Sequence, residues 1–568
     1  MKLSKLYQLI WVLPGLIMIG SCGKDFLDTR LDTMPTDENI ESSYTTIKQL
    51  ANTPYAYMRN INEFTALDGN LSAPVSDEAV QTNTVGNVYL FNNGVWSPFN
   101  NPDDRYSYYY AGINAVNYFL EYLDKHDGDY RSLLAVNRDT ITVDTRKAFL
   151  DDVALMGWSI AEAHVIRAYY YFELIKRYGR TPLVNKTFPA NTSPQIAASS
   201  FDEVTAYIVK EINDYQNALQ PNWKTSAFAN QDGRFSKGAA LALKARVLQY
   251  AASPLHNASN DQAKWIAAAN AANEALEFAR QTGNNQLDNN YRNYFLGSNT
   301  LTSAETIMAV RFDPDNALER ANYPIGTAGG NSGITPTQNL VGAYEWKGAA
   351  DPNNPYANRD PRLEMSIVTN GSNWNGRIID QSAGQSDDAR RQNASRTGYY
   401  LKKFVNDQVD LINNATNTHH WPIFRYAELV LTYAEAMNEA YGPDQSNGQT
   451  WTAREAVNLV RSRPSVEMPA VVAAGKEQMR SAIKGERQVE LAFENYRYWD
   501  VVRWGDAATV QNQTITGVSV SKTAAGVFQY QTKEVQQRKF IAPKMNYYPF
   551  PQREIQISNG TLTQNPGW

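Results

Sequence analysis

The sequence is poor in the residues that form disulfides and bind metals. Its 568 residues include a single cysteine, Cys22, and only five histidines. One cysteine permits no internal disulfide, so a large hydrophobic core has to hold the fold together. No uninterrupted apolar run approaches the roughly 20 residues that a membrane-spanning helix needs. We therefore expect a chain that crosses no membrane and depends on core packing for its stability.

The cysteine closes a segment with the order typical of a secretory signal peptide. Two lysines precede the largely apolar residues 6–19, and the small residues Gly20 and Ser21 stand directly before Cys22. A bacterial signal of this kind is cut just before a cysteine that receives lipid. We predict that residues 1–21 are removed and that Cys22 anchors the protein to a membrane. The alternative is a buried free thiol.

Charge and the residues after the anchor say less about function. Lys2 and Lys5 fall in the removed segment, so 53 basic residues become 51 against 58 acidic ones, a net charge of -7. An acidic balance argues against nucleic acid as a partner. Asp25 and Asp28 follow the anchor closely. They mark either a sorting signal or an ordinary polar tether, and the sequence leaves both readings open.

Helical periodicity dominates two parts of the chain. Apolar residues recur at three- and four-residue steps in 106–123, 159–178, 201–219, 238–252, 261–280, 424–441, 452–463 and 478–504. Gly179 and Pro182 are typical of a helix end. Successive helices with many alanines resemble a tetratricopeptide solenoid, although the strict repeat signature is absent. The fold class that we predict is all-α, a tetratricopeptide-like scaffold.

Between these helical parts, residues 282–420 are rich in Asn, Gly and Pro and predict a loop-rich second lobe. The glycine run at 329–333 lacks the Gly-Lys-Ser/Thr ending of a phosphate loop and is interpreted as a turn. We expect one compact body with two sequence halves. These are an N-terminal helical region at 22–281 and a C-terminal region at 282–568, where helices return after the loops.

Aromatic residues beside amides mark the candidate ligand site. Asp68 and Trp96 belong to an asparagine-rich, loop-like segment at 68–104, and Trp346 and Trp374 lie in the loop-rich part. An aromatic ring covers the apolar face of a sugar while amides bond to its hydroxyls. We therefore take Asp68, Trp96, Trp346 and Trp374 as candidate ligand-binding residues and expect Trp374 to be the most exposed. The alternative is that the rings pack on the core.

No metal or catalytic motif stands out. Adjacent rings, as in His419-His420, rarely meet one ion, and 313–316 lacks the pattern of a calcium loop and is interpreted as a turn. The zinc-protease, nucleophile-elbow and phosphate-loop motifs are absent. Mixed charges along 478–504 indicate structural ion pairs. We expect no metal, no cofactor and no enzymatic activity, although 58 acidic residues neither show nor exclude a glycosidase carboxylate pair.

Ordered motifs resemble those of the SusD/RagB family of outer-membrane nutrient-binding lipoproteins. The matching stretches are 22–28, 167–174, 178–179, 182–183, 233–240, 244–246, 336–341, 359–362, 403–404, 425–429, 434–436, 486–487, 497–500 and 564–568. Each stretch is weak alone, but their order along nearly the whole chain is specific.

The resemblance implies a helical scaffold with four tetratricopeptide-like units and a lipid-anchored, surface-exposed position at the outer membrane. It also implies a SusC-like TonB-dependent transporter as partner, to which captured oligosaccharides are delivered. Some members of the family take peptides, so a peptide-binding, RagB-like protein is the first alternative. A surface glycoside hydrolase and a scaffold that binds only protein are further alternatives. The shared motifs maintain the fold and do not identify the ligand.

Overall fold

The computed structural model describes residues 36–568 apart from 60, 190, 191, 193, 194, 229 and 285. The predicted signal segment, the predicted lipid attachment site Cys22 and the acidic residues after it lie outside the described residues. Within the described part, no helix combines the length and the apolar character that crossing a membrane requires.

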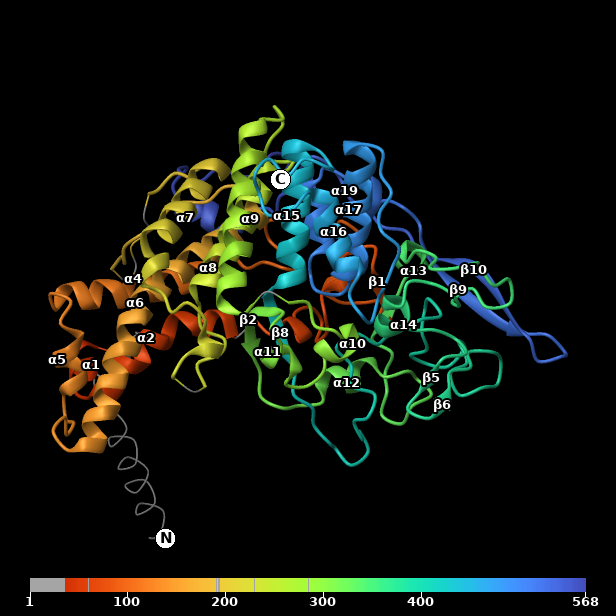
Figure 1. Ribbon diagram of the computed structural model, residues 1–568, viewed down its shortest axis with the longest axis horizontal. Helices are drawn as coiled ribbons and strands as arrows, with labels where there is room; N and C mark the ends of the chain where they lie inside the picture. Colours follow the sequence, from red (N-terminus) through yellow and green to blue (C-terminus); the bar gives the residue numbers. More distant parts are fainter. Residues whose placement is uncertain (1–35, 60, 190–191, 193–194, 229, 285) are drawn as a thin grey trace, which may run out of the picture.

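Long helices form an array in which successive members pack side by side (Figure 1). They are α2 (Tyr44–Arg59), α4 (Tyr106–Lys125), α6 (Val143–Tyr178), α7 (Phe201–Tyr215), α8 (Lys237–Ala252) and α9 (Gln262–Thr282). After the irregular lobe the array resumes with α15 (Tyr426–Tyr441), α16 (Ala453–Arg461) and α17 (Lys476–Glu490). Helix α15 packs on α8 and α9. The predicted helical, tetratricopeptide-like class is confirmed.

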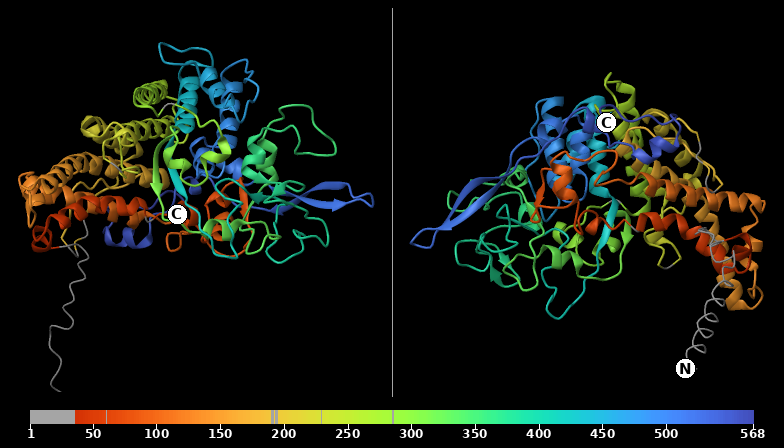
Figure 2. Two further views of the ribbon diagram at one scale, coloured as in Figure 1. Left: turned by 60° about the horizontal axis from the view of Figure 1, so that its bottom comes forward. Right: turned by 180° about the vertical axis from the view of Figure 1, so that it is seen from behind.

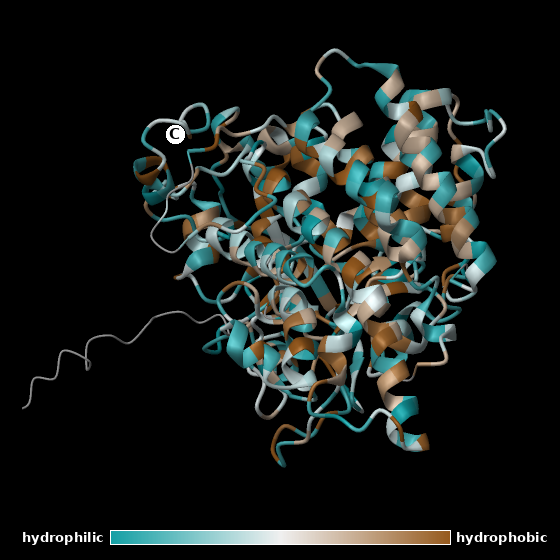
Figure 3. Ribbon diagram, turned by 90° about the vertical axis from the view of Figure 1, so that its left-hand side faces the viewer, coloured by the Kyte–Doolittle hydropathy of each residue, from teal (hydrophilic) through white to brown (hydrophobic). Residues whose placement is uncertain are grey.

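Small residues set the close spacing of this array. On α8, the side chains of Ala239, Ala240, Ala242 and Ala245 are at most 1% exposed, and α9 buries a similar set of alanines. Since alanine has no side chain beyond Cβ, neighbouring helices approach closely and bury their backbones against one another. Hydrophobic residues alternate with hydrophilic ones along the helices (Figure 3), as expected of helices buried on one face.

Several helix ends have local capping signals, and the end of α6 at Gly179 is the one that the sequence predicts. Gly179 closes α6 in the left-handed region, with φ +75°. Ser200 and Glu203 form a capping box at the start of α7. Helix α6 begins 16 residues earlier than predicted, at Val143. Its first two turns are largely exposed, so they lack the apolar periodicity that marks a buried helix.

The second lobe consists of short elements joined by loops. Its helices are α10 (Tyr291–Tyr294), α11 (Asn299–Thr302), α12 (Ala317–Asn322), α13 (Gln338–Ala343) and α14 (Arg362–Ser366). Its antiparallel strand pairs are β2 (Thr306–Arg311) with β8 (His420–Arg425), β4 (Ile367–Val368) with β7 (Tyr400–Leu401), and β5 (Asn373–Trp374) with β6 (Arg377–Ile378). The loop-rich character predicted for 282–420 thus includes short regular elements.

Other short elements connect the array and the lobe. They are α1 (Asp37–Glu41), α3 (Asn87–Asn92), α5 (Tyr130–Ala135), α18 (Arg497–Arg503), α19 (Ala507–Gln511), α20 (Gln552–Ile557), β1 (Ala79–Gln81), β3 (Ile334–Pro336), β9 (Ile515–Lys522) and β10 (Phe528–Gln536). Strand β1 pairs with β3, which joins the segment predicted as loop at 68–104 to the second lobe. The β9–β10 hairpin projects at the end of the molecule opposite to α1 and α5 (Figures 1 and 2).

The prediction of one continuous helix at 478–504 is wrong. Helix α17 ends at Glu490 and α18 begins at Arg497, because Phe493 and Asn495 adopt left-handed backbone angles with φ of +65° and +62°. Because of this turn, the charged side chains of α17 and α18 pair largely with different residues. Sequence spacing alone could not indicate this, because each helix keeps its own three- and four-residue periodicity.

The buried charged residues of α17 form structural ion pairs, as predicted, with partners on other segments, whereas the exposed Glu477 pairs with Arg480 within the helix. Glu490 accepts hydrogen bonds from Arg362 on α14, Arg425 at the end of β8, and Arg463 after α16, at 2.7–2.9 Å. Burial favours a raised pKa for Glu490, yet these three guanidinium groups hold the pKa well below its usual value. Arg425 also binds Glu305 and Glu494. We call these residues the buried ion network.

Candidate functional site

The structure places Trp374 in the core. Its side chain is 0% exposed, and its ring meets Tyr323 edge-on at 5.3 Å between centroids. In the β5–β6 hairpin, the exposed Asn373 and the buried Trp374 alternate as strand geometry requires. The prediction that Trp374 is the most exposed aromatic residue is therefore wrong, and its ring has no surface to offer a ligand in this structure.

Trp96 is also a core residue, with a side chain that is 3% exposed. Its ring stacks on Phe91 of α3 at 5.1 Å and contacts Tyr548 and the C-terminal Trp568. The alternative reading, in which a loop aromatic packs on its own core, describes this residue. Trp96 joins the C-terminal end of the chain to the segment at 68–104.

Asp68 and Trp346 remain at the surface. The carboxylate of Asp68 accepts hydrogen bonds from the backbone N–H groups of Asn87 and Val88, both at 2.9 Å, so it caps the start of α3. Trp346 follows α13, is 41% exposed and has the Arg359 guanidinium 4.4 Å from its ring centroid. Asp68 and Trp96 both contact α3, whereas Trp346 and Trp374 belong to the second lobe. The structure therefore does not assemble the four candidates into one site.

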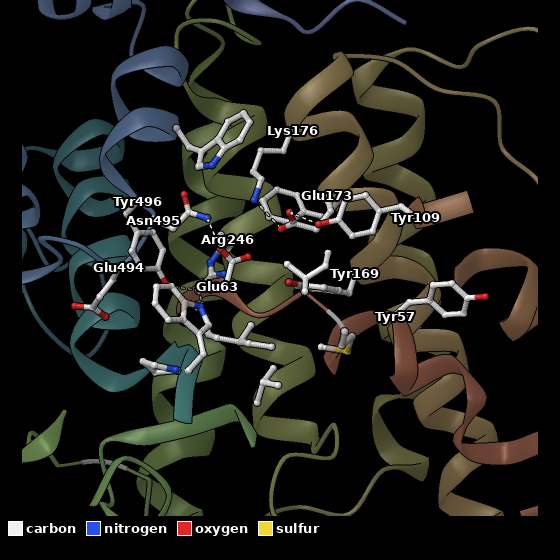
Figure 4. A pocket seen from close by; sticks show the side chains of 18 of the residues that line it. Tyr57, Glu63, Tyr109, Tyr169, Glu173, Lys176, Arg246, Glu494, Asn495 and Tyr496 are labelled. Atoms are coloured by element: carbon white, nitrogen blue, oxygen red, sulfur yellow. Dashed lines mark hydrogen bonds and ion pairs between the residues drawn. The ribbon is translucent and has the colours of Figure 1, made fainter. Parts of the chain in front are cut away.

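A small polar chamber lies where α2, α6 and α8 meet the segment between α17 and α18 (Figure 4). Glu63, Glu173, Lys176 and Arg246 converge on it, and its cavity volume is about 70 Å³. Glu173 is ion-paired with Lys176 at 2.7 Å. A cavity of this volume has room for a few water molecules and not for a sugar ring. We regard the chamber as a polar interface between the N-terminal helices and the C-terminal half of the chain.

The chamber holds one carboxyl group with an unusual proton affinity. The Glu63 carboxylate accepts a hydrogen bond from Asn495 Nδ2 at 3.2 Å. Burial raises the pKa of Glu63 to about 7, the positive charge of Arg177 opposes this rise, and the negative charge of Glu173 adds to it. Burial likewise lowers the pKa of Lys176 to about 8. The protonation of the chamber therefore changes near neutral pH.

An open groove with a cavity volume of about 800 Å³ is a better candidate for a ligand site. We name it the β2–β8 groove. Its walls are formed by the C-terminal part of α2, the loop before α8, and the strands β2 and β8, with lining residues that include Asn52, Tyr55, Arg59, Asn230, Arg234, Arg311, Phe312, Asp313 and His420. Binding sites for small molecules typically enclose about 300–1,000 Å³.

Charged and aromatic side chains line the groove in fixed positions. Arg59 on α2 pairs with Asp313 after β2 at 2.8 Å, and both side chains are exposed. Below them, the Tyr55 hydroxyl donates to Glu162 at 2.8 Å, and Arg234 binds the same carboxylate at 2.7 Å. These bonds hold the half-buried Tyr55 ring in place. Phe312 is half-buried and meets Phe64 edge-on at 6.0 Å.

His420 contributes a neutral imidazole to the groove. Burial lowers its pKa to about 4, with further contributions from Arg311 and His419, so the ring is uncharged at neutral pH. Its buried Nδ1 has no hydrogen-bond partner. The neighbouring His419 instead binds Glu319 at 3.0 Å. Within the described ranges, no group of three or more His, Cys, Asp or Glu side chains is arranged to hold a metal ion.

The groove combines amides, guanidinium groups, two carboxylates and aromatic rings around an open space. This mixture suits a polyhydroxylated ligand, since rings cover apolar faces and the polar groups bond to hydroxyls. The sequence did not indicate these residues as a site. Tyr55, Arg234, Phe312 and His420 come from four distant segments, and no local pattern joins them. The signals in the sequence were a family-like motif at 233–240, and the histidine pair and residues 313–316, which were considered for metal alone.

Comparisons with known proteins agree with this architecture. The SusD family model matches residues 275–568, and a second model, described as "Starch-binding associating with outer membrane", matches residues 25–248. Among curated proteins, the chain is 26% identical to SusD-like protein P38 of Formosa agariphila, over 62% of this chain and 67% of the relative. It is 23% identical to SusD-like protein P25 of the same organism, over 87% and 89% of the two chains.

Solved structures share the fold. A SusD-like protein from Bacteroides fragilis superposes with a TM-score of 0.72 and 24% identity, covering 95% of this chain and 99% of that chain. A SusD-like carbohydrate-binding protein from the same organism gives a TM-score of 0.71 with 23% identity, covering 92% and 99%. Because the SusD family model alone spans more than half of the sequence, this chain belongs to the SusD family.

Proposed function

We propose that this protein is a cell-surface lipoprotein that captures oligosaccharides and delivers them to a SusC-like TonB-dependent transporter. The observation that carries the proposal is the β2–β8 groove, whose volume and mixture of rings, amides and charged groups suit a short glycan. Membership of the SusD family supports it. So do the description of one matching model as starch-binding and that of a structural neighbour as carbohydrate-binding.

In this proposal, the rings of Tyr55 and Phe312 stack on sugar faces while Arg59 and the amides of Asn52 and Asn230 bond to hydroxyls. Each aromatic contact contributes roughly 1 kcal/mol beyond burial. A few such contacts give modest affinity, which suits a protein that has to release its cargo to a transporter. His420 belongs to the wall of the groove, but its Nδ1 is buried and is not exposed to a ligand.

The location in the proposal is the outer membrane, with Cys22 as the lipid attachment point. The description "associating with outer membrane" of the model that matches residues 25–248 supports this location. Labelled fatty acid should be incorporated into the intact protein and not into a Cys22→Ser variant. Equal labelling of the two proteins, or of neither, would contradict lipidation at Cys22.

Calorimetry with a panel of oligosaccharides and peptides tests ligand capture. We expect heat of binding from at least one oligosaccharide and a loss of affinity of about fivefold in Phe312→Ala, equivalent to about 1 kcal/mol. The matched control is Phe99→Ala, which removes a ring that is 81% exposed and outside the groove. Binding of peptides alone would favour the RagB-like alternative, and cleavage of the bound glycan would favour a hydrolase.

A parallel variant, Trp346→Ala, tests the sequence-based candidate that stays at the surface. If Trp346 contributes a second stacking position, its loss should weaken the binding of longer oligosaccharides more than that of short ones. Unchanged affinity for every length would exclude Trp346 from the ligand site. Unchanged affinity in Phe312→Ala would exclude the β2–β8 groove.

A further inference from the structure

The corner between α5 and α6 exposes apolar side chains at its tip. Ile141 is 84% exposed and Val143 is 82% exposed, and Leu150 lies two turns along α6 from Val143 and is 41% exposed. Most large apolar residues of the described part of the chain are buried, so two neighbouring β-branched residues at this degree of exposure form an unusual surface. We call residues 136–150 the α5–α6 corner.

The corner has a defined conformation. Asp139 Oδ1 accepts hydrogen bonds from the backbone N–H groups of Ile141 and Thr142, at 2.8 and 3.2 Å. The guanidinium of Arg138 lies over the ring of Tyr44 at 4.4 Å and binds Asp152 at 2.8 Å. These contacts fix the backbone on both sides of Ile141. The apolar tip is therefore presented to solvent by a preformed turn.

The corner is attached to the elements with which the described chain begins. Asn137 Nδ2 donates to the Ser42 carbonyl at 2.6 Å, and the Tyr44 N–H donates to the Val136 carbonyl at 3.3 Å. Figure 1 shows α1 and α5 together at one end of the molecule, where the described residues start. The α5–α6 corner and the start of α1 therefore lie at the same end of the molecule.

We propose that the α5–α6 corner docks onto the lipid surface to which the chain is tethered, a step that rests on the proposed lipidation of Cys22. Thirteen residues separate Cys22 from Thr36, the first described residue. Even fully extended, this stretch reaches at most about 50 Å. A tether of this length leaves the corner within reach of the bilayer surface, where burying Ile141 and Val143 among lipid is favourable.

Burial of apolar groups, and not charge, drives this docking. Around the tip the four cations Arg131, Arg138, Arg146 and Lys147 are balanced by Asp139, Asp144, Asp151 and Asp152. Lys147 is paired with Asp151 at 2.6 Å and Arg138 with Asp152 at 2.8 Å. A surface without net charge gains little from anionic headgroups. The contact should therefore form on zwitterionic lipid and persist at high salt. It adds a second, oriented attachment to the one through Cys22.

A fluorescent label tests the contact in the intact lipoprotein. Once Cys22 is acylated, a cysteine introduced by Ile141→Cys is the only free thiol and takes an environment-sensitive dye. The matched control is Val472→Cys, at a residue that is 97% exposed between α16 and α17. In phosphatidylcholine vesicles containing lipid with a nitroxide near the headgroup, we expect quenching at position 141 at least threefold stronger than at position 472, and unchanged in 1 M salt.

Equal quenching at the two positions would overturn the proposal. So would an unquenched label at position 141 that becomes shielded only when a transporter is added, because the corner would then be a protein interface. The mass of the Cys22 peptide shows separately whether the tether has formed, and calorimetry with oligosaccharides reads the proposed glycan site independently. A result showing that the corner does not contact lipid can thus be distinguished from a lack of lipidation at Cys22 and from a lack of glycan binding.

Discussion

The α8–α9 pair of the helical array and the junction with the irregular second lobe are held together by different interactions. Helix α9 buries only apolar side chains, and alanines on α8 and α9 let the two helices meet backbone to backbone, although other array helices bury ion pairs such as Arg167–Glu211. At the junction with the lobe, Arg362, Arg425 and Arg463 converge on Glu490 and its acidic neighbours in a fully buried network. Regular helices can pack through shape alone, whereas short elements joined by loops need directional bonds to fix their positions.

Breaking the buried ion network should have the largest effect. We expect Arg425→Met to lower the free energy of unfolding by about 3–5 kcal/mol, because it leaves Glu305, Glu490 and Glu494 buried with fewer cationic partners. Denaturant unfolding of the two proteins measures the difference. A change below about 1 kcal/mol would mean that the network fixes the geometry of the lobe without contributing to its stability.

Enlarging a buried residue in the helical array should have the second-largest effect on stability. In Gly112→Ala on α4, the new Cβ would lie 2.7 Å from Cε2 of the buried Tyr170 on α6. Overpacking of this kind costs about 1–3 kcal/mol, more than the helix propensity that alanine gains.

The matched control for this variant is Gly485→Ala on α17, where no atom lies within 4 Å of the new Cβ. It should be stabilised by about 0.5–1 kcal/mol. Thermal unfolding of both variants should therefore show shifts of opposite sign. Shifts of the same sign would show that spacing in the array does not decide the outcome.

The contribution of the polar chamber to the free energy of unfolding should depend on pH. Burial raises the pKa of Glu63 to about 7, above its usual value near 4.5, so the folded state binds the proton more tightly than the unfolded state. Stability from this group is present at low pH and is lost as the pH rises toward 7. Relative to the wild type, Glu63→Gln should therefore gain about 2–3 kcal/mol between pH 5 and pH 8. A constant difference between the two proteins would contradict the shifted pKa.

The smallest effect on stability is expected at the mouth of the groove. Arg59 and Asp313 pair with side chains that are 61% and 90% exposed, so Arg59→Met should change the free energy of unfolding by less than about 1 kcal/mol. Calorimetry should nevertheless show weaker oligosaccharide binding if Arg59 contacts the ligand. A large loss of stability would show that this surface pair supports the fold, as the buried network does.

The prediction from sequence succeeds where a feature depends on neighbouring residues. The buried apolar faces of α8, α9 and α15 follow from three- and four-residue periodicity. The end of α6 follows from the left-handed backbone angle that Gly179 adopts. Prediction from sequence fails where a side chain meets partners from far along the chain. Trp374 sits in a polar, glycine-flanked hairpin that predicts exposure, but Tyr323 and the surrounding lobe cover it.

The candidate site shows the same limit. Trp346 and Asp68 are at the surface, but the groove is built from Tyr55, Phe312 and His420, which no local pattern connects. Likewise, the charges of α17 indicate ion pairs, yet their partners Arg362, Arg425 and Arg463 could not be assigned from spacing along one helix. A helix can be predicted because its apolar residues repeat along the sequence. A network of ion pairs between distant segments leaves no such repeat in the sequence.

The sequence by itself determined the helical class, the positions of most long helices and the membership in the SusD family, because these depend on periodicity and on ordered motifs. Only the tertiary structure decided which aromatic rings remain accessible, which charges pair, and where an open groove forms. The physical reason is that burial and pairing depend on distances between segments, which are set when the array and the lobe pack against each other.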